Sequence, residues 1–258
     1  MKRIVFILAT LAAVAGGAVM GMRLGREKFS PPSQIKPDLY GLKSGGGIYI
    51  YGARVGDGIY VFDTGADPQG RPVDALLAAL KGGRDDVRSI FMTHGHFDHI
   101  AGALQFPKAR TYLGVQDVGL ASGAVMPDAL AAMALTKVMQ IPPVSITNPI
   151  KGRQTFSLSQ GQTVKAFPVP GHTAGSYAFL FDGVLFPGDI MILKEGRLET
   201  TPSVFDAHPE ANRASIRALK TQLDTETLET VCTAHGGCTP KGLGRSMLND
   251  LVERIGAS

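Results

Sequence analysis

Residues 93–102 read Thr-His-Gly-His-Phe-Asp-His-Ile-Ala-Gly, and no other stretch of the 258-residue chain is as informative about fold and chemistry. Four potential metal ligands, His94, His96, Asp98 and His99, fall within six positions. Clustered imidazoles repel one another when they are protonated, whereas neutral imidazole and carboxylate bind divalent metal ions well. An apolar, strand-like run precedes the cluster. A tight loop after that strand can direct His94 and His96 at one metal ion, while Asp98 and His99 begin the next helix and face a second.

Three further residues repeat this setting. His172, His235 and Asp189 each follow an apolar run of β type, and each adjoins a glycine. Ligand sites in α/β proteins gather beyond the carboxyl ends of strands, so we expect these side chains to join the cluster. Of the six histidines, only His208 falls outside the pattern.

At these residues the chain resembles the metallo-β-lactamase superfamily of hydrolases. The shared motifs, five in the family's order, are His-x-His-x-Asp-His at 94–99, Gly-His-Thr-x-Gly-Ser at 171–176, Gly-Asp at 188–189, Ala-His-Gly at 234–236 and a strand followed by Asp-Thr-Gly at 63–65. The resemblance covers roughly residues 40 to 258. It implies an α/β fold, the four-layer αβ/βα sandwich, with the active site along one edge.

The resemblance also implies roles for the site residues. It assigns His94, His96 and His172 to a first metal ion, Asp98, His99 and His235 to a second, and Asp189 to a bridge between them. Asp63 is expected to hydrogen-bond a ligand and fix a histidine tautomer. The cofactors are then two divalent metal ions, with zinc expected and iron or manganese as alternatives. A water held between two cations loses a proton near neutral pH and attacks an acyl carbonyl or a phosphoryl centre, and Asp98 is a candidate for orienting it.

The branch of the superfamily bears on the substrate. Metallo-β-lactamases proper generally lack the aspartate that Asp189 matches, whereas glyoxalase II-type thioesterases and acyl-homoserine lactonases carry it. Glyoxalase II enzymes also have a helical C-terminal domain that binds glutathione, and here only 23 residues follow His235. We therefore expect hydrolysis of a small-molecule ester, thioester, lactone or amide. The alternatives are a β-lactamase and a non-catalytic metal-binding domain held at a membrane.

The N-terminus has a different composition. Residues 4–22 carry no charge, and Lys2, Arg3 and Arg23 flank them. Such a run is typical of a signal peptide or a membrane anchor, which we assign to residues 1–23. Residues 24–40, with their prolines, are expected to form a linker, and residues 41–258 the hydrolase domain. The domain would then be exported, or anchored at the inner membrane and facing a bacterial periplasm.

The net charge of +4 belongs to this N-terminal part. Residues 1–30 hold five basic side chains and one acidic side chain, and the rest of the chain holds 21 of each. An enzyme that acts on nucleic acid needs a basic face, so no nucleic-acid partner is expected. The sequence indicates no oligomeric state.

Two features leave alternatives open. Cys232 and Cys238 flank His235 and could form a disulfide outside the cytoplasm, but an apolar strand cysteine and a separate loop cysteine are favoured. Residues 114–142 resemble an insertion with helices at 115–121 and 128–140. The second helix is apolar on nearly every side, which favours a packed core helix, while its methionines also suit a lid or a wall for an apolar substrate tail.

Overall fold

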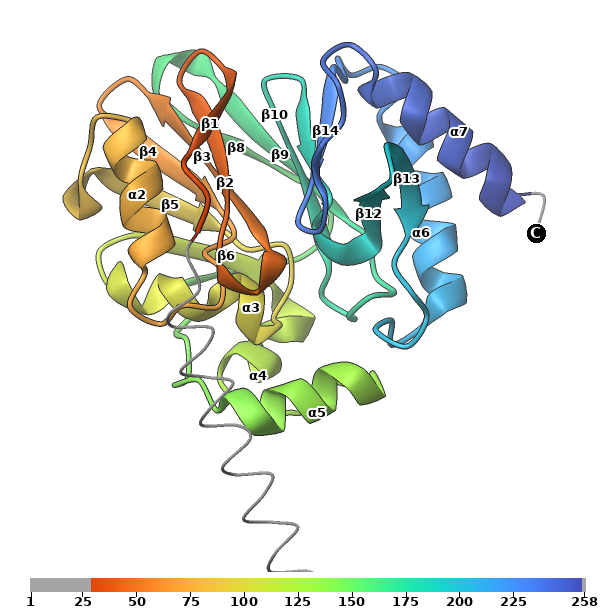
Figure 1. Cartoon of the computed structure of the whole chain (residues 1–258), viewed down its shortest axis with the longest axis horizontal. Coiled ribbons are helices and arrows are strands. Elements are labelled where there is room, and N and C mark those ends of the chain that lie inside the picture. Colours follow the sequence, from red (N-terminus) through yellow and green to blue (C-terminus); the bar gives the residue numbers. More distant parts are fainter. Residues whose placement is uncertain (1–28, 257–258) are drawn as a thin grey trace, which may run out of the picture.

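Two β-sheets packed face to face form the centre of this computed structural model, which describes residues 29–256 (Figure 1). The first sheet follows chain order and comprises β1 (Ser33–Lys36), β2 (Leu39–Lys43), β3 (Tyr49–Val55), β4 (Gly58–Phe62), β5 (Val87–Phe91), β6 (Arg110–Gly114) and β7 (Asn148–Ile150). The second sheet runs in the order β15 (Gly237–Cys238), β14 (Thr230–Thr233), β11 (Val184–Phe186), β10 (Tyr177–Phe181), β9 (Thr163–Pro168) and β8 (Gln154–Ser157). A separate hairpin pairs β12 (Met191–Lys194) with β13 (Arg197–Thr200).

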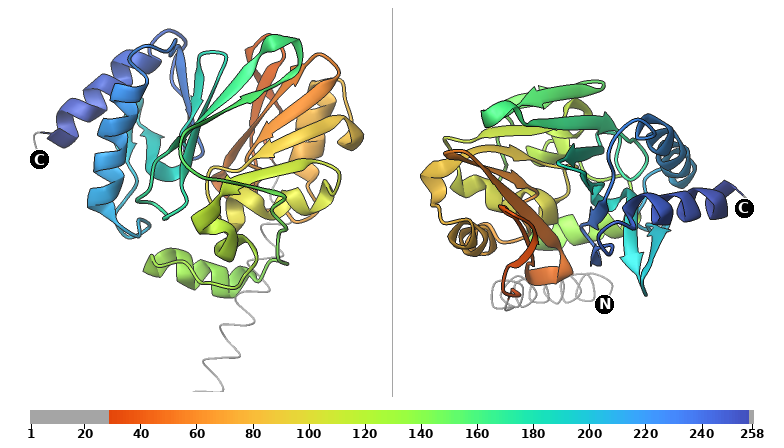
Figure 2. Two further views of the ribbon diagram at one scale, coloured as in Figure 1. Left: turned by 180° about the vertical axis from the view of Figure 1, so that it is seen from behind. Right: turned by 90° about the horizontal axis from the view of Figure 1, so that it is seen from above.

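Helices cover the outer faces of both sheets. The α-helices among the described residues are α2 (Arg71–Ala79), α3 (Phe97–Ile100), α4 (Val118–Ala121), α5 (Leu130–Met139), α6 (Pro209–Gln222) and α7 (Gly244–Gly256). Helix α2 lies on the outside of the first sheet, and α6 and α7 lie on the outside of the second (Figures 1 and 2). Helices α4 and α5 lie beyond the edge of the sandwich at which α3 begins. The predicted αβ/βα sandwich is confirmed.

Strands with apolar residues on both faces explain why four layers form. Successive side chains of a strand point to opposite faces, and in β4 Ile59 and Val61 pack towards α2, while Tyr60 and Phe62 pack between the sheets. Such a strand buries both faces only when a helix covers one and a second sheet covers the other. The four layers therefore follow from strands that are apolar on both faces.

Aromatic rings hold the two sheets together. The ring of Phe62 lies 4.1 Å from that of Phe186, centroid to centroid, and Phe91 lies 5.3 Å from Phe179. Aromatic pairs contribute about 0.5–1.5 kcal/mol each beyond the area that they bury. The strands that carry the site loops are therefore fixed relative to one another across the sandwich.

The structure corrects the expected linker. Residues 33–36 and 39–43 are strands of the first sheet, so the folded domain begins well before residue 41. Asp38, with φ of +59°, makes the turn between the two strands, in the left-handed region that aspartate tolerates better than most residues. The signal or anchor segment at residues 1–23 lies outside the described residues. None of the helices within residues 29–256 has the length and hydrophobicity of a membrane span.

The interpretation of residues 128–140 as a core helix is wrong. Only Ala132 of α5 is buried, and Leu130 is 77% exposed. Composition cannot distinguish a helix that is buried in the core from one that borders a cavity, because both are apolar. In this protein α5 borders a cavity, which is described below.

Candidate metal centre

Each predicted ligand follows the carboxyl end of a strand. His94 and His96 lie in the loop after β5, His172 lies after β9, Asp189 lies in a short 3-10 turn after β11, and His235 lies in the turn between β14 and β15. Asp98 and His99 lie on α3, directly after the first loop. These strand ends meet at one edge of the sandwich, so the structure brings all seven predicted ligands together.

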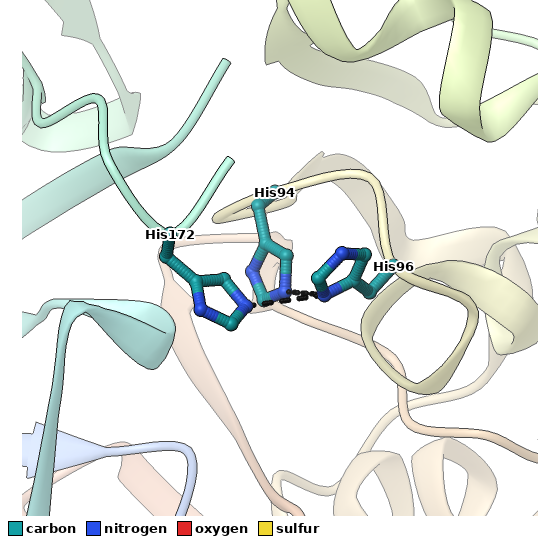
Figure 3. Close-up of side chains that lie close together, drawn as sticks. All are labelled: His94, His96 and His172. Carbon is teal, nitrogen blue, oxygen red and sulfur yellow. Dashed lines mark hydrogen bonds between the residues drawn. The ribbon is translucent and has the colours of Figure 1, made fainter. Parts of the chain in front are cut away.

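Three imidazoles form the first group of ligand atoms. Nε2 of His94 lies 3.0 Å from Nδ1 of His96, and that atom lies 3.1 Å from Nε2 of His172. Figure 3 shows the three rings pointing at one another from two loops. All three side chains are buried. Their nitrogens lie close enough together to bind one metal ion.

The second group contains Asp98, His99 and His235, whose ligand atoms also lie within 4.8 Å of one another. Asp189 lies between the two groups. Its Oδ1 is 3.4 Å from Nε2 of His99, and its Oδ2 is 3.2 Å from Nε2 of His235 and 3.8 Å from Nε2 of His172. One carboxylate therefore contacts both groups, as a bridging ligand must.

The electrostatic environment differs between the two ligand groups. Burial, together with the neighbouring imidazoles, holds the pKa of His94 and of His96 well below the usual range, so both rings stay neutral. Burial alone would lower the pKa of His99, but nearby carboxylates, Asp189 first, raise it. Burial would likewise raise the pKa of Asp189, but His235 and His99 outweigh it and hold that pKa well below its usual range.

Two buried atoms test whether this donor set fits a metal ion. Nε2 of His99 and Oδ1 of Asp189 are fully buried, yet neither has a hydrogen-bond partner within residues 29–256. A buried polar group without a partner is costly. A cation between them would satisfy both, and the nitrogen-rich set matches the preferences of zinc.

Asp63 lies where the sequence predicts it, beside the ligands. One carboxylate oxygen is 2.8 Å from Nδ1 of His99, and the carboxylate also accepts hydrogen bonds from the backbone amide and the hydroxyl of Thr93. With Nδ1 of His99 donating to Asp63, Nε2 is left as the lone-pair atom that faces the site. Asp63 thereby fixes both the tautomer and the loop that follows β5.

Asp117 is a supporting residue that sequence reasoning missed. Its buried carboxylate accepts hydrogen bonds from the backbone amides of Gly95 and Gly175 and from the hydroxyl of Thr173. It therefore ties the loop of His94 and His96 to the loop of His172. A Cβ on Gly95 or Gly175 would lie 2.9 Å or 2.6 Å from atoms of Asp117, so these glycines permit the close approach.

Asp206, also missed, holds His172. Its Oδ1 lies 2.9 Å from Nδ1 of His172, and its Oδ2 accepts a hydrogen bond from Asn212 of α6. The arrangement repeats that of Asp63 and His99, because the carboxylate again accepts a hydrogen bond from Nδ1 and leaves Nε2 for the site. His208, two residues further on, is exposed and its ring belongs to none of the ligand groups.

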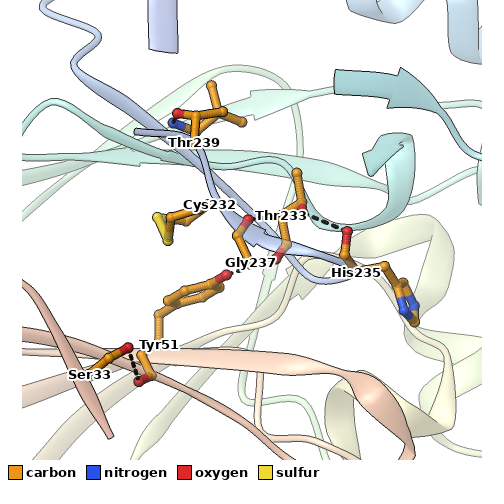
Figure 4. Close-up of a disulfide and its surroundings, with 10 residues drawn as sticks. Ser33, Tyr51, Cys232, Thr233, His235, Gly237 and Thr239 are labelled. Carbon is orange, nitrogen blue, oxygen red and sulfur yellow. Dashed lines mark hydrogen bonds between the residues drawn. A yellow bond between two sulfur atoms is a disulfide. The ribbon is translucent and has the colours of Figure 1, made fainter. Parts of the chain in front are cut away.

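A disulfide closes the turn that carries His235. Cys232 and Cys238 lie directly opposite each other on β14 and β15 and are bonded, which corrects the favoured interpretation of two unpaired cysteines. Figure 4 shows the bond on one side of this hairpin and the His235 ring on the other. The hydroxyl of Thr233 also donates to the carbonyl oxygens of His235 and Gly237.

A cavity of about 900 Å³ gives access to the centre. Five of the predicted ligands contribute to its lining, namely His96, Asp98, His172, Asp189 and His235. The side chain of His235 is 38% exposed, whereas those of His99 and His172 are almost fully buried. The centre is therefore open to small molecules on the side of His235 and Asp98.

Curated proteins similar in sequence to this chain are hydroxyacylglutathione hydrolases. The chain is similar to hydroxyacylglutathione hydrolase of Acidiphilium cryptum, with 35% identity over 159 residues that make up 60% of this chain and 52% of that protein. The enzyme of the same name from Yersinia enterocolitica is 30% identical over 165 residues, covering 62% of this chain and 52% of that one. The chain spans about half the length of these relatives.

Solved structures share the fold. A metallo-beta-lactamase of Cronobacter sakazakii with a HARLDQ motif superposes with a TM-score of 0.67 at 19% identity, covering 88% of this chain and 92% of that one. A subclass B3 metallo-beta-lactamase of Bradyrhizobium japonicum superposes with a TM-score of 0.62 at 22% identity, covering 88% and 93%. A family model described as the metallo-beta-lactamase superfamily matches residues 45–235, and the chain therefore belongs to this superfamily of metal-dependent hydrolases.

Proposed function

We propose that the protein is a binuclear metal-dependent hydrolase that cleaves an ester, thioester, lactone or amide. The contact of Asp189 with both ligand groups supports this proposal most strongly, because a carboxylate placed between two imidazole-rich groups suits a pair of neighbouring ions. When bound, two divalent ions, with zinc the best match to the donors, polarise a carbonyl and lower the pKa of water.

The chain's own residues orient and enclose the reaction. Asp63 and Asp206 hold the ligand imidazoles of His99 and His172 in the tautomer with Nε2 free. Burial raises the pKa of Asp98, which lines the cavity beside the second ligand group. Its carboxylate is placed to accept a proton from water and to pass it to the leaving group. The proposed mechanism assigns no serine or cysteine nucleophile, and the two cysteines are joined in a disulfide.

We also propose that the domain works outside the cytoplasm, exported or anchored at the inner membrane. The uncharged run at residues 4–22 supports this, and so does the disulfide, since such bonds persist mainly in oxidising compartments. The N-terminal segment would link the domain to the membrane if it is not cleaved.

A substrate panel tests the proposed activity. The purified zinc-loaded full-length protein should be assayed with an aryl ester, a thioester, a lactone, a phosphodiester and a β-lactam. We expect turnover of at least one of the first three, loss of that turnover in Asp189→Asn, and retention in His208→Ala. Exclusive cleavage of the β-lactam would favour the β-lactamase alternative. No turnover of any compound by the two-metal protein would favour the non-catalytic alternative.

A further inference from the structure

The cavity over the metal centre has one predominantly apolar side. Helix α5 contributes Ala132 and Leu135, and the loop after β13 contributes Pro202 and Phe205. Positions 132 and 135 are three apart and so lie on one face of the helix. Ile192 of β12 is a further apolar residue that lines the cavity.

The apolar surface continues out of the cavity. Leu130 on α5 is 77% exposed, and Val204 and Phe205 on the facing loop are 56% and 39% exposed. A second cavity of about 100 Å³ also reaches His96 and His172 and is lined by Val125 and Met126, both of which are exposed. Apolar side chains that are exposed on the segments forming these two cavities are typical of a binding surface.

Charge at the cavity argues against a strongly anionic substrate. Among the described residues that line it, Lys43 is the one lysine or arginine, at the side formed by residues 43–48. A substrate recognised through several carboxylates needs more cations than this. An uncharged chain needs none, and it fits the apolar side chains of Leu135, Phe205 and Ile192, which also line the cavity.

We propose that the acyl group of the substrate is a long aliphatic chain, which lies between α5 and the loop at residues 202–205 while its carbonyl reaches the metal centre. This inference rests on the proposed hydrolase function and specifies its substrate class. Free amphiphiles and membrane lipids both carry such chains, and the site recognises the chain that they share. Leu135 and Phe205 are specificity-determining residues that bind the chain from two different elements.

The expected chain-length dependence follows from burial. Each methylene moved from water into an apolar site contributes about 0.8 kcal/mol, which is about fourfold in kcat/KM. The octanoyl ester of one alcohol should therefore be cleaved at least ~100-fold more efficiently than the acetyl ester.

The test uses the full-length protein with zinc and p-nitrophenyl esters from acetyl to dodecanoyl, kept below their micellar concentrations. Leu135→Ser and Phe205→Ser should each lower kcat/KM for the octanoyl ester about tenfold and leave the acetyl ester nearly unchanged. Leu243→Ser is the matched control, because it makes the same change at an exposed leucine that lies just before α7 and does not line the cavity. It should leave the whole series unchanged. Two variants on separate elements keep the test decisive if one of them fails to fold.

The outcomes separate this inference from the function on which it rests. A flat chain-length series with robust acetyl turnover would overturn the inference and leave the hydrolase proposal standing. Absence of turnover with every ester would overturn both. A palmitoyl ester embedded in phosphatidylcholine vesicles distinguishes the sources: faster cleavage there than in solution would identify membrane lipid, and the reverse would identify a free amphiphile.

Discussion

Replacing Asp206 with asparagine changes one atom of a buried side chain and should weaken one metal site selectively. The side chain of Asp206 is 2% exposed, and its two oxygens accept hydrogen bonds from Nδ1 of His172 and from the amide of Asn212. Asparagine offers one acceptor and one donor in the same space. In either rotamer, one of the two donors then faces an amide NH2.

The magnitude follows from these two bonds. Hydrogen bonds to a charged group contribute about 1.5–3 kcal/mol and neutral ones about 1 kcal/mol, so one bond is lost and the other is weakened. If the amide turns its NH2 towards His172, the imidazole loses the acceptor that keeps Nε2 free. Changes to such supporting residues typically reduce metal affinity about 10–100-fold. We expect a loss of this size at the group of His94, His96 and His172, and little change at the other.

The assay is a zinc titration of the apo-protein against a chromophoric chelator, which resolves two binding steps. Asp85→Asn is the matched control, because it makes the same change at an exposed carboxylate that pairs with Lys108 and precedes β5, whereas the ligand loop follows that strand. Two unchanged affinities in Asp206→Asn would refute the role of Asp206 in orienting His172. Equal losses at both steps would point to general destabilisation instead.

Three further predictions concern the ligands, the disulfide and the location of the protein. His172→Ala and Asp189→Ala should each lower turnover at least ~100-fold at limiting zinc, with the circular dichroism spectrum unchanged. His208→Ala should retain activity, and an equal loss of turnover in that variant would place His208 in the site. The double variant Cys232→Ser/Cys238→Ser should lower the free energy of unfolding by about 2 kcal/mol. It should also lower the affinity of one zinc-binding step, because the disulfide closes the turn that carries His235. Unchanged urea unfolding and zinc binding would contradict this. Alkaline phosphatase fused to the C-terminus should be active in cells, since it folds only in an oxidising compartment; an inactive fusion beside a fluorescent cytoplasmic reporter would refute export.

The ligand set could be predicted because its signals are local. Each ligand lies in or just after a glycine-containing turn that follows an apolar run, and strand ends of a sandwich converge at one edge. Asp63 could be predicted in the same way, from the Asp-Thr-Gly turn after β4. Short motifs of this kind encode both the chemistry and the position in the fold.

The residues that the sequence did not reveal act over long separations. Asp206 is 34 positions from His172, and Asp117 is 58 positions from Gly175, so no local pattern links either pair.

The pairing of Cys232 with Cys238 depends on β15, which is only two residues long. The first of the two strands at residues 33–43 follows a proline pair and lies at one edge of the sheet, where proline is tolerated.

A count of bound metal is the most direct test of the central claim that two ligand groups share Asp189. Elemental analysis of full-length protein purified without chelator should give about two ions per chain, with zinc predominant. Chelation should abolish acyl-ester hydrolysis, and added zinc should restore it. A folded protein that contains no metal and still hydrolyses the ester would contradict the account.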